Sequence, residues 1–257
     1  MRVSLYVETL GQGPPLALLH GWGLHGGIWH SVRAALAQRF TLHIIDLPGH
    51  GYSQQVEADS LAAIAYALEA VLPPQCHVCG WSFGGLVALH IAATRPERIH
   101  KLVLVSTTPC FVQREDWLPG MSAAVHNDFA ARLKADYRRT LLNFLSLQVL
   151  NDARARALLR DLREVLLARG EPHPDALGVG LRMLQGSDLR ALVAHIDHSA
   201  LVIHGERDTL TPRAAGDWLA QYLPDALYAP FQQCAHAPFL SHPERFVATL
   251  GEFLDGK

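Results

Sequence analysis

The feature that most constrains the fold of this 257-residue chain is an alternation of short apolar strands and helices at both ends of the sequence. Such an alternation implies a mostly parallel sheet with helices on both faces, so we predict an α/β fold. The expected strands are residues 16–20, 41–46, 77–80, 101–106, 200–204 and 227–228, and the expected helices are residues 60–72, 84–93, 212–222 and 243–254.

The middle of the chain interrupts this alternation. From about Gln113 to Gly186 no segment has the pattern of a strand, whereas residues 128–150 and 152–167 are helical in pattern and rich in leucine, alanine and arginine. A helical block inside a strand–helix alternation is typical of an inserted cap rather than a second independent domain. We predict a core of residues 1–112 and 187–257 and a helical cap of residues 113–186.

Composition excludes several classes of protein. Hydrophobic residues make up 49% of the chain and charged residues 18%, which is not the composition of a disordered protein. The net charge of −2 argues against a general nucleic-acid binder. The first residues contain no apolar signal core, and no run of about 18 apolar residues occurs, so we expect a cytoplasmic protein without a membrane partner. We also expect a monomer.

The four cysteines are too few for a disulfide scaffold. Cys76 and Cys79 form a Cys-x-x-Cys pair, which could indicate a redox or zinc site. The pair lies in an expected strand, however, where residues three apart point to opposite faces. We interpret both as buried thiols and expect no metal and no cofactor.

A candidate nucleophile lies in the sequence Gly-Trp-Ser-Phe-Gly, residues 80–84, which matches G-x-S-x-G. The match falls between an expected strand and an expected helix, where a sharp turn lifts Ser82 above the sheet. Glycines are needed because such a turn leaves no room for a Cβ atom. The N–H groups at the start of the helix then point toward Ser82. The alternative is a tight turn with an exposed serine.

A serine hydroxyl needs a base, and folds of this type place their acid and base after the serine in the chain. Asp208 follows the expected strand 200–204, and His236 lies in a loop before the last helix. We assign Asp208 as the carboxylate that orients the imidazole and His236 as general base and acid. Glu206 and His242 are rivals at nearby positions. Three further histidines are set aside because no acidic residue at a strand end is expected beside them: His20, His25 and His50.

The tetrahedral intermediate of acyl transfer needs two N–H donors for its oxyanion. The segment His-Gly-Trp-Gly, residues 20–23, follows an early strand, where such folds supply one donor. We assign the backbone N–H groups of Trp22 and Phe83 to this role. The alternative for residues 20–23 is an ordinary glycine turn.

With these segments in place, the sequence resembles the α/β-hydrolase superfamily along its whole length. The matching segments are residues 20–23, 46–53, 80–84, 205–208 and 235–238. The resemblance implies the α/β-hydrolase fold but not the substrate, because esterases, lactonases, carbon–carbon bond hydrolases and haloperoxidases share these segments. Dehalogenases and epoxide hydrolases usually carry an aspartate where this chain has Ser82.

The chain is also similar, cap included, to the pimeloyl-[acyl-carrier protein] methyl ester esterases of biotin synthesis. The segments that carry this similarity are residues 139–148 and 235–243. The resemblance implies hydrolysis of a methyl ester at the far end of a pimeloyl chain held by acyl carrier protein. It implies that the substrate contacts Trp22, Ser82, Phe83, Phe144, Leu145, Ser146, Leu147, Gln148 and His236.

The resemblance further implies carrier contacts from Arg139, Arg156 and Arg160, whereas Asn143 stands where another arginine is expected. Arg154 or Arg163 is a candidate to compensate. Residues 132–169 contain nine basic and four acidic side chains, and Arg156, Arg160 and Arg163 share one helix face. Such a face would suit an acidic carrier, although a solvated basic face is the ordinary alternative.

Two other functions remain open. One is a broad-specificity short-chain carboxylesterase or lactonase that has no carrier partner. The other is a non-catalytic binding protein with a hydrolase fold, for which a complete set of Ser82, Asp208 and His236 would have no use.

Overall fold

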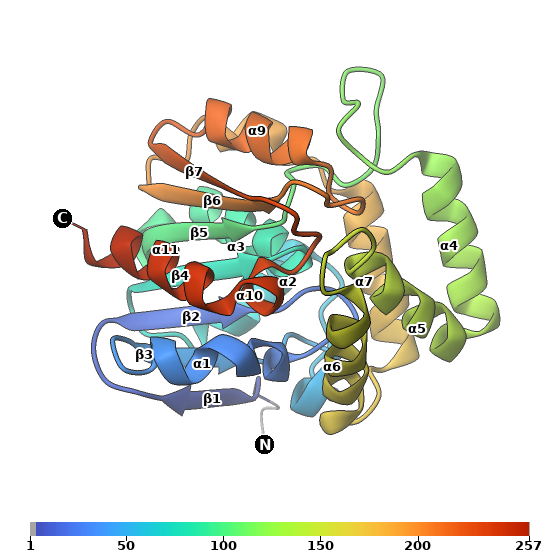
Figure 1. Ribbon diagram of the computed structural model, residues 1–257, viewed down its shortest axis with the longest axis horizontal. Helices are drawn as coiled ribbons and strands as arrows, with labels where there is room; N and C mark the ends of the chain where they lie inside the picture. The colour runs from blue at the N-terminus through green and yellow to red at the C-terminus, as the bar shows by residue number, and fades with distance from the viewer. Residues whose placement is uncertain (1–3, 257) are drawn as a thin grey trace.

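The computed structural model describes residues 4–256, and a seven-stranded sheet forms its centre (Figure 1). The strand order is β1-β3-β2-β4-β5-β6-β7, and every neighbouring pair is parallel except β1 with β3. The predicted α/β fold with a mostly parallel sheet is confirmed. The strands are β1 (Val7–Leu10), β2 (Pro15–Leu19), β3 (Thr41–Ile45), β4 (Cys76–Trp81), β5 (Ile99–Val105), β6 (Ala200–Gly205) and β7 (Ala226–Phe231).

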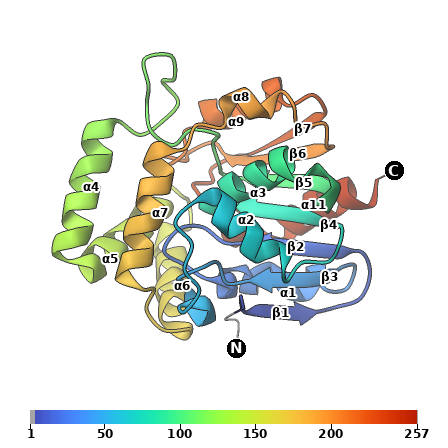
Figure 2. The same cartoon turned by 180° about the vertical axis from the view of Figure 1, so that it is seen from behind.

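Helices cover both faces of the sheet, as the buried central strands require. Figure 1 shows one face with α1 (His30–Leu36), α10 (Pro238–Ser241) and α11 (Pro243–Asp255). Figure 2 shows the other face with α2 (Leu61–Glu69), α3 (Phe83–Thr94) and α8 (Arg190–Val193). Nine of the twelve residues of α3 are buried, so this helix lies deep against β4 and β5. The remaining core elements are α9 (Arg213–Tyr222) and the short 3-10 helices η1 (Gly26–Trp29), η2 (Gly51–Ser53) and η3 (Pro96–Arg98).

Between β5 and α8 the chain leaves the sheet and forms four helices, which we call the cap helices. They are α4 (Ala123–Ala135), α5 (Tyr137–Gln148), α6 (Ala155–Ala168) and α7 (Pro174–Gly186), and they lie together at one end of the sheet (Figures 1 and 2). Their burial is one-sided, as in α6, where the buried residues are Leu158, Leu162, Val165 and Leu166. The domain boundaries proposed from the sequence remain a prediction.

Several sequence-based expectations need correction. The single helix expected over residues 128–150 is two helices, because Asp136 has extended backbone (φ −153°) and its carboxylate accepts the Arg139 N–H at 3.1 Å to begin α5. Strand β1 and helix α1 were not predicted. The stretch expected to lack strands, which the structure describes throughout, does lack them, and it contains only isolated bridges, from Val112 to Met121 and from Arg114 to Trp117.

The four cysteines are all buried free thiols. Burial raises the pKa of Cys76 to about 11 and also raises that of Cys79, so both thiols stay protonated and unreactive near neutral pH. Among the described residues, no helix combines the length and apolarity needed to cross a membrane.

Candidate active site

Ser82 occupies a strained turn between β4 and α3. Its backbone has φ +54° and ψ −117°, a conformation that residues with a side chain rarely adopt. The neighbouring glycines allow the turn, because a Cβ on Gly80 would lie 2.3 Å from the Gly84 carbonyl oxygen and one on Gly84 would lie 2.4 Å from that of Leu19. The Ser82 N–H donates to the Val105 carbonyl at 2.9 Å and the Thr107 hydroxyl donates to the Ser82 carbonyl at 2.7 Å. These bonds hold the serine at the carboxyl end of the sheet.

Asp208 lies after β6 in a buried nest of donors. One carboxylate oxygen accepts the N–H groups of Leu210 and Thr211 at 2.9 and 3.0 Å, and the other accepts the Thr211 hydroxyl at 2.7 Å. The second oxygen also lies 2.7 Å from Nδ1 of His236. Burial alone would raise the pKa of Asp208, but the charge and hydrogen bond of His236 outweigh it and lower that pKa. The carboxylate is therefore ionised and fixed in direction.

His236 is held from three sides. Its Nδ1 faces Asp208, its backbone N–H donates to the Gln148 carbonyl at 3.1 Å, and its own carbonyl accepts the Trp81 indole N–H at 2.8 Å. The Trp81 ring also lies 5.4 Å from the imidazole, measured between ring centroids. Because Gln148 ends α5, the cap helices contribute directly to the position of this histidine.

Ser82 and His236 line the same cavity. Within residues 4–256 no hydrogen bond joins the Ser82 hydroxyl to His236, although the Asp208 contact leaves Nε2 of His236 available to accept one. Such bonds are often loose in structures without substrate and tighten when it binds. The arrangement can carry out nucleophilic attack with proton transfer once this bond forms.

The rival residues occupy other places. Glu206 lies at the surface 3.4 Å from an Arg213 nitrogen, and His242 stands between α10 and α11. The expectation that no acid lies near His25 is wrong: Asp46 directly follows β3, and its charge acts on the His25 imidazole. Asp46 bonds to the Gly26 N–H at 2.7 Å, however, and none of these residues reaches the cavity of Ser82.

The two N–H groups assigned to the oxyanion site are available. In the described part of the chain, neither the Trp22 nor the Phe83 backbone N–H donates a hydrogen bond to another residue. Gly21 is packed beside Ser82, and a Cβ added to this glycine would lie 3.3 Å from the Ser82 Cβ. Residues 20–23 therefore pass next to the serine, as the oxyanion assignment requires.

An apolar cavity extends from Ser82 toward the cap helices. Core and cap both contribute to its wall, which consists of Trp22, Ser82, Phe111, Met121, Val125, His126, Phe129, Phe144, Leu147, Leu181, Leu184, Leu210 and His236. Trp22 packs edge-on against Phe129 and Phe144, with ring centroids 5.6 and 5.0 Å away. The indole N–H of Trp22 donates to the Leu177 carbonyl at 3.0 Å, which leaves the wall almost without polar groups.

The residues predicted to touch substrate fall into three groups. Trp22, Ser82, Phe144, Leu147 and His236 line the cavity. The side chain of Phe83 borders a second cavity, between residues 48–64 and α7. The rest of the segment points elsewhere: Leu145 and Gln148 are buried, and the Ser146 hydroxyl donates to the Leu142 carbonyl at 3.3 Å.

Sequence reasoning missed much of the wall. Phe111, Met121 and Leu210 lie in irregular segments, whose patterns give no signal of which side chain faces inward. Val125, His126 and Phe129 are neighbours on one face of α4 at helical spacing, which could have indicated an inward face. Thr211, which bonds to Asp208, was also missed, although it lies three residues after this aspartate in a turn.

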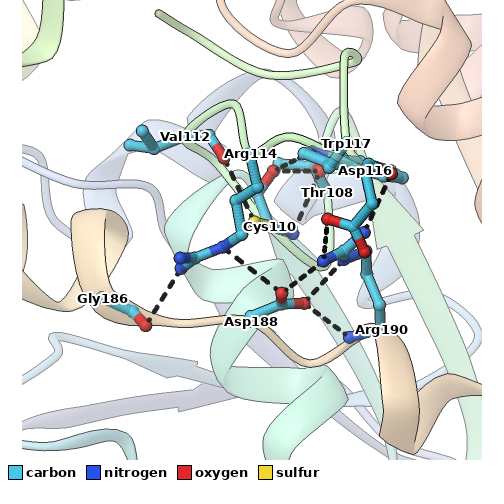
Figure 3. A network of polar contacts seen from close by, with 9 residues as sticks. All are labelled: Thr108, Cys110, Val112, Arg114, Asp116, Trp117, Gly186, Asp188 and Arg190. Carbon is cyan, nitrogen blue, oxygen red and sulfur yellow. Dashed lines mark hydrogen bonds and ion pairs between the residues drawn. The ribbon is translucent and has the colours of Figure 1, made fainter. Parts of the chain in front are cut away.

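The segment that carries Phe111 and Met121 is tied to the start of α8 (Figure 3). Arg190 binds Asp116 at 3.0 Å and Asp188 at 2.7 Å, and Arg114 lies 3.3 Å from Asp188. The Trp117 indole donates to the Cys110 carbonyl at 2.7 Å. This network, which we call the neck, joins the segment that leaves the core to the segment that returns to it.

The predicted carrier contacts Arg139, Arg156 and Arg160 are all exposed, as is Arg163. Arg154 instead donates to the Ser241 carbonyl at 2.9 Å, so Arg163 is the better replacement for the arginine missing at position 143. The basic excess of residues 132–169 is smaller than the count suggests, because three of the arginines pair with acids outside that stretch. Those pairs are Arg132 with Asp128, Arg138 with Glu171, and Arg169 with Glu8 and Asp46.

Comparison with known proteins identifies relatives of the whole chain. A family model described as the α/β hydrolase fold matches residues 14–243. A pimeloyl-[acyl-carrier protein] methyl ester esterase from Nitrosomonas europaea is 46% identical, over 95% of this chain and 97% of its own length. Proteins with the same name from Nitrosospira multiformis and Chromobacterium violaceum are 42% and 44% identical, each over 98% of this chain and at least 98% of their own length.

Solved structures show the same fold. A hydrolase from Pseudomonas aeruginosa PA01 has a TM-score of 0.84 at 26% identity, covering 98% of this chain and 94% of that one. An enol-lactonase from Burkholderia xenovorans LB400 also has a TM-score of 0.84, at 22% identity, over 98% of this chain and 96% of its own. The second likeness concerns the fold alone.

Proposed function

The chain belongs to the α/β-hydrolase family and, within it, to the pimeloyl-[acyl-carrier protein] methyl ester esterases; it is a carboxylic ester hydrolase. We propose that it hydrolyses the methyl ester of pimeloyl-[acyl-carrier protein] in biotin synthesis, releasing methanol and the free carboxylate. The observation that carries this proposal is the apolar cavity, which begins at Ser82 and His236 and ends among cap side chains.

The proposed reaction has two steps. Ser82 attacks the ester carbonyl while His236 accepts its proton, and Asp208 holds the imidazole and stabilises its positive charge. The N–H groups of Trp22 and Phe83 bind the oxyanion. As the tetrahedral intermediate collapses, His236 donates its proton to the departing methoxide, which leaves as methanol, and the same histidine then activates a water that releases the acid from the serine. The lowered pKa of Asp208 supports its part, because an ionised carboxylate is needed beside the imidazolium.

The cavity wall suits an aliphatic acyl chain. Phe144 and Leu147 of α5 and Phe129 of α4 supply apolar surface, and each buried methylene of a substrate contributes about 0.8 kcal/mol. A chain of methylenes that ends in a methyl ester would bury its apolar part here and place the ester at Ser82. No protein group in this mechanism needs a metal or cofactor to act.

Exposed arginines on α5 and α6 are the proposed site for the carrier. Arg156, Arg160 and Arg163 lie on the outer face of α6, and Arg139 lies at the start of α5. An acidic carrier protein that holds its acyl chain on a phosphopantetheine arm would be attracted to such a face. A monomeric state and a cytoplasmic location stay predictions.

The test compares a carrier-bound methyl ester with p-nitrophenyl butyrate, a small ester that needs no carrier. In the doubly substituted Arg156→Glu, Arg160→Glu protein we expect kcat/KM for the carrier-bound ester to fall about 10- to 100-fold, which corresponds to a loss of about 0.7–1.4 kcal/mol for each of the two charge contacts. The small ester should be unaffected. Matched controls are Arg132→Glu and Arg138→Glu, whose arginines already pair with acids.

Three outcomes are informative. Equal losses on both esters, or none on either, would favour a broad carboxylesterase or lactonase without a carrier partner. A Ser82→Ala protein that turns over either ester at a near-normal rate would overturn the nucleophile assignment. Growth of a biotin-requiring strain that lacks this esterase should be restored by the natural chain and not by Ser82→Ala.

A further inference from the structure

Two buried histidines outside the proposed catalytic set lie beside the oxyanion segment. His20 begins that segment, His50 belongs to the loop that follows β3, and both side chains are shielded from solvent. Their rings pack edge-on, with centroids 5.3 Å apart. Neither lines the cavity of Ser82, so neither is placed to take part in proton transfer.

The hydrogen bonds of His50 assign its tautomer. Its Nδ1 lies 2.9 Å from the Pro48 carbonyl oxygen, which can only accept, so Nδ1 carries the proton. Its Nε2 accepts the Gly23 N–H at 3.3 Å. His20 has the same arrangement: Nδ1 donates to the Gly21 carbonyl at 2.8 Å, and Nε2 accepts the Leu47 N–H at 2.9 Å.

These bonds connect two loops through their imidazoles. His50 accepts the N–H of Gly23, and His20 donates to the carbonyl of Gly21. The peptide groups on both sides of Trp22 are therefore held by hydrogen bonds. Gly23 has φ +76°, a left-handed conformation that glycine adopts readily, so its own backbone preferences do little to fix this turn. Burial lowers the pKa of both histidines, which keeps Nε2 unprotonated and able to accept.

We propose that His50 is a positioning residue for the oxyanion site, acting through the Gly23 N–H to aim the Trp22 N–H at the developing charge on the substrate. The inference rests on the serine esterase chemistry proposed above. Oxyanion donors act only when they are aimed before the reaction begins, and loss of one typically lowers kcat about 10²- to 10³-fold. A misdirected donor should cost part of that factor.

Two substitutions separate the contacts of His50. A glutamine amide reaches the place of Nε2, so His50→Gln can still accept the Gly23 N–H. An asparagine amide reaches only the place of Nδ1, so His50→Asn keeps the Pro48 contact and loses Gly23. With p-nitrophenyl butyrate we expect His50→Asn to lower kcat about 10-fold or more with KM within twofold, and His50→Gln to recover most of kcat.

A trifluoromethyl ketone, which forms a tetrahedral oxyanion adduct on the serine, provides a second readout. Its inhibition constant should rise in His50→Asn by the same factor as kcat falls, and should return toward the natural value in His50→Gln. Equal kcat in the two variants, or a loss of thermal stability without a change in kcat, would overturn the proposal. A natural protein inactive on small and carrier-bound esters alike would instead overturn the proposed function.

One measurement needs no substitution. Nitrogen-15 NMR of the histidine-labelled protein should show His50 as the neutral Nδ1–H tautomer at pH 7. Finding the proton on Nε2 would exclude acceptance of the Gly23 N–H and would also overturn the proposal.

Discussion

The carboxyl edge of the sheet and the cap helices above it hold their polar groups in opposite ways. At the sheet edge the groups that orient the reaction are buried and bonded, as with Asp208, which accepts from two N–H groups, a hydroxyl and an imidazole. On α5 and α6 the arginines stand in solvent, and the buried side chains are mainly leucine and valine. The core therefore fixes the directions of reacting groups, whereas the cap supplies apolar volume and surface charge.

The difference explains which part of the molecule tolerates change. A hydrogen-bond acceptor at the sheet edge cannot be moved without disorienting its partners, but an apolar wall accepts other residues of similar volume. Several residues connect the two regions, and one of them does so through ion pairs. Arg169, which follows α6, reaches down to the core and binds Glu8 at 2.5 Å and Asp46 at 2.9 Å.

The largest expected effect belongs to the sheet edge. Asp208→Asn keeps the shape of the side chain but removes its charge. It also replaces one of the carboxylate oxygens, one of which accepts the Nδ1–H of His236, with an amide NH₂ group. We expect kcat for p-nitrophenyl butyrate to fall about 10⁴-fold with little change in KM, as in serine proteases with this change. A fall in kcat of less than tenfold would mean that catalysis by His236 does not depend on Asp208. The sheet edge would then not fix the directions of the reacting groups as described above.

The next effect concerns the ion pair between cap and core. Arg169→Met leaves the fully buried Asp46 carboxylate with its N–H partners only, so we expect the free energy of unfolding in urea to fall by about 3–5 kcal/mol. The matched control is Arg138→Met. Its partner is Glu171 and its side chain is 69% exposed, so a loss of at most about 1 kcal/mol is expected. Similar losses in the two variants would show that the cap does not depend on this buried contact.

The smallest effect is the share of one buried histidine in the pH dependence of stability, which arises in the core. Burial lowers the folded-state pKa of His20, His25 and His50. Below pH about 6.5 the unfolded chain therefore binds more protons at these histidines than the folded chain does. The free energy of unfolding should therefore decrease as the pH falls from 7 to 5, by at most about 1.4 kcal/mol per pH unit for each histidine. Urea unfolding at each pH measures the slope, and His50→Gln should make it shallower. An unchanged slope in that variant would mean that His50 does not contribute to the pH dependence of stability.

The division between core and cap also decides what could be predicted from sequence. Ser82, Asp208 and His236 each follow a strand of a parallel sheet, and strand ends meet at one edge, so local patterns were enough to bring them together. The structure places Asp208 against His236 and puts Ser82 and His236 on one cavity. Their catalytic roles remain the proposal made above.

The cavity wall and the buried ion pair could not be predicted in this way. Phe111 and Met121 lie in an irregular segment, and the partners Arg169 and Asp46 are 123 residues apart with no periodic relation. Strand β1 was missed because it is only four residues long and none of its side chains is fully buried. Such features depend on tertiary packing, which a single sequence does not display.

The neck has a consequence for how such enzymes can be rebuilt. Because the Leu189 N–H donates to the Pro109 carbonyl at 2.9 Å, and Arg114 reaches the Gly186 carbonyl at 3.4 Å, the chain leaves and rejoins the core at adjacent points. To the core, everything between these points is one closed loop, and doubling the length of such a loop costs only about 0.6 kcal/mol. Cap segments from relatives with other substrates could therefore replace this one at the neck. Arg190, Asp116 and Asp188 would be retained, because their ion pairs join the two ends of the inserted segment.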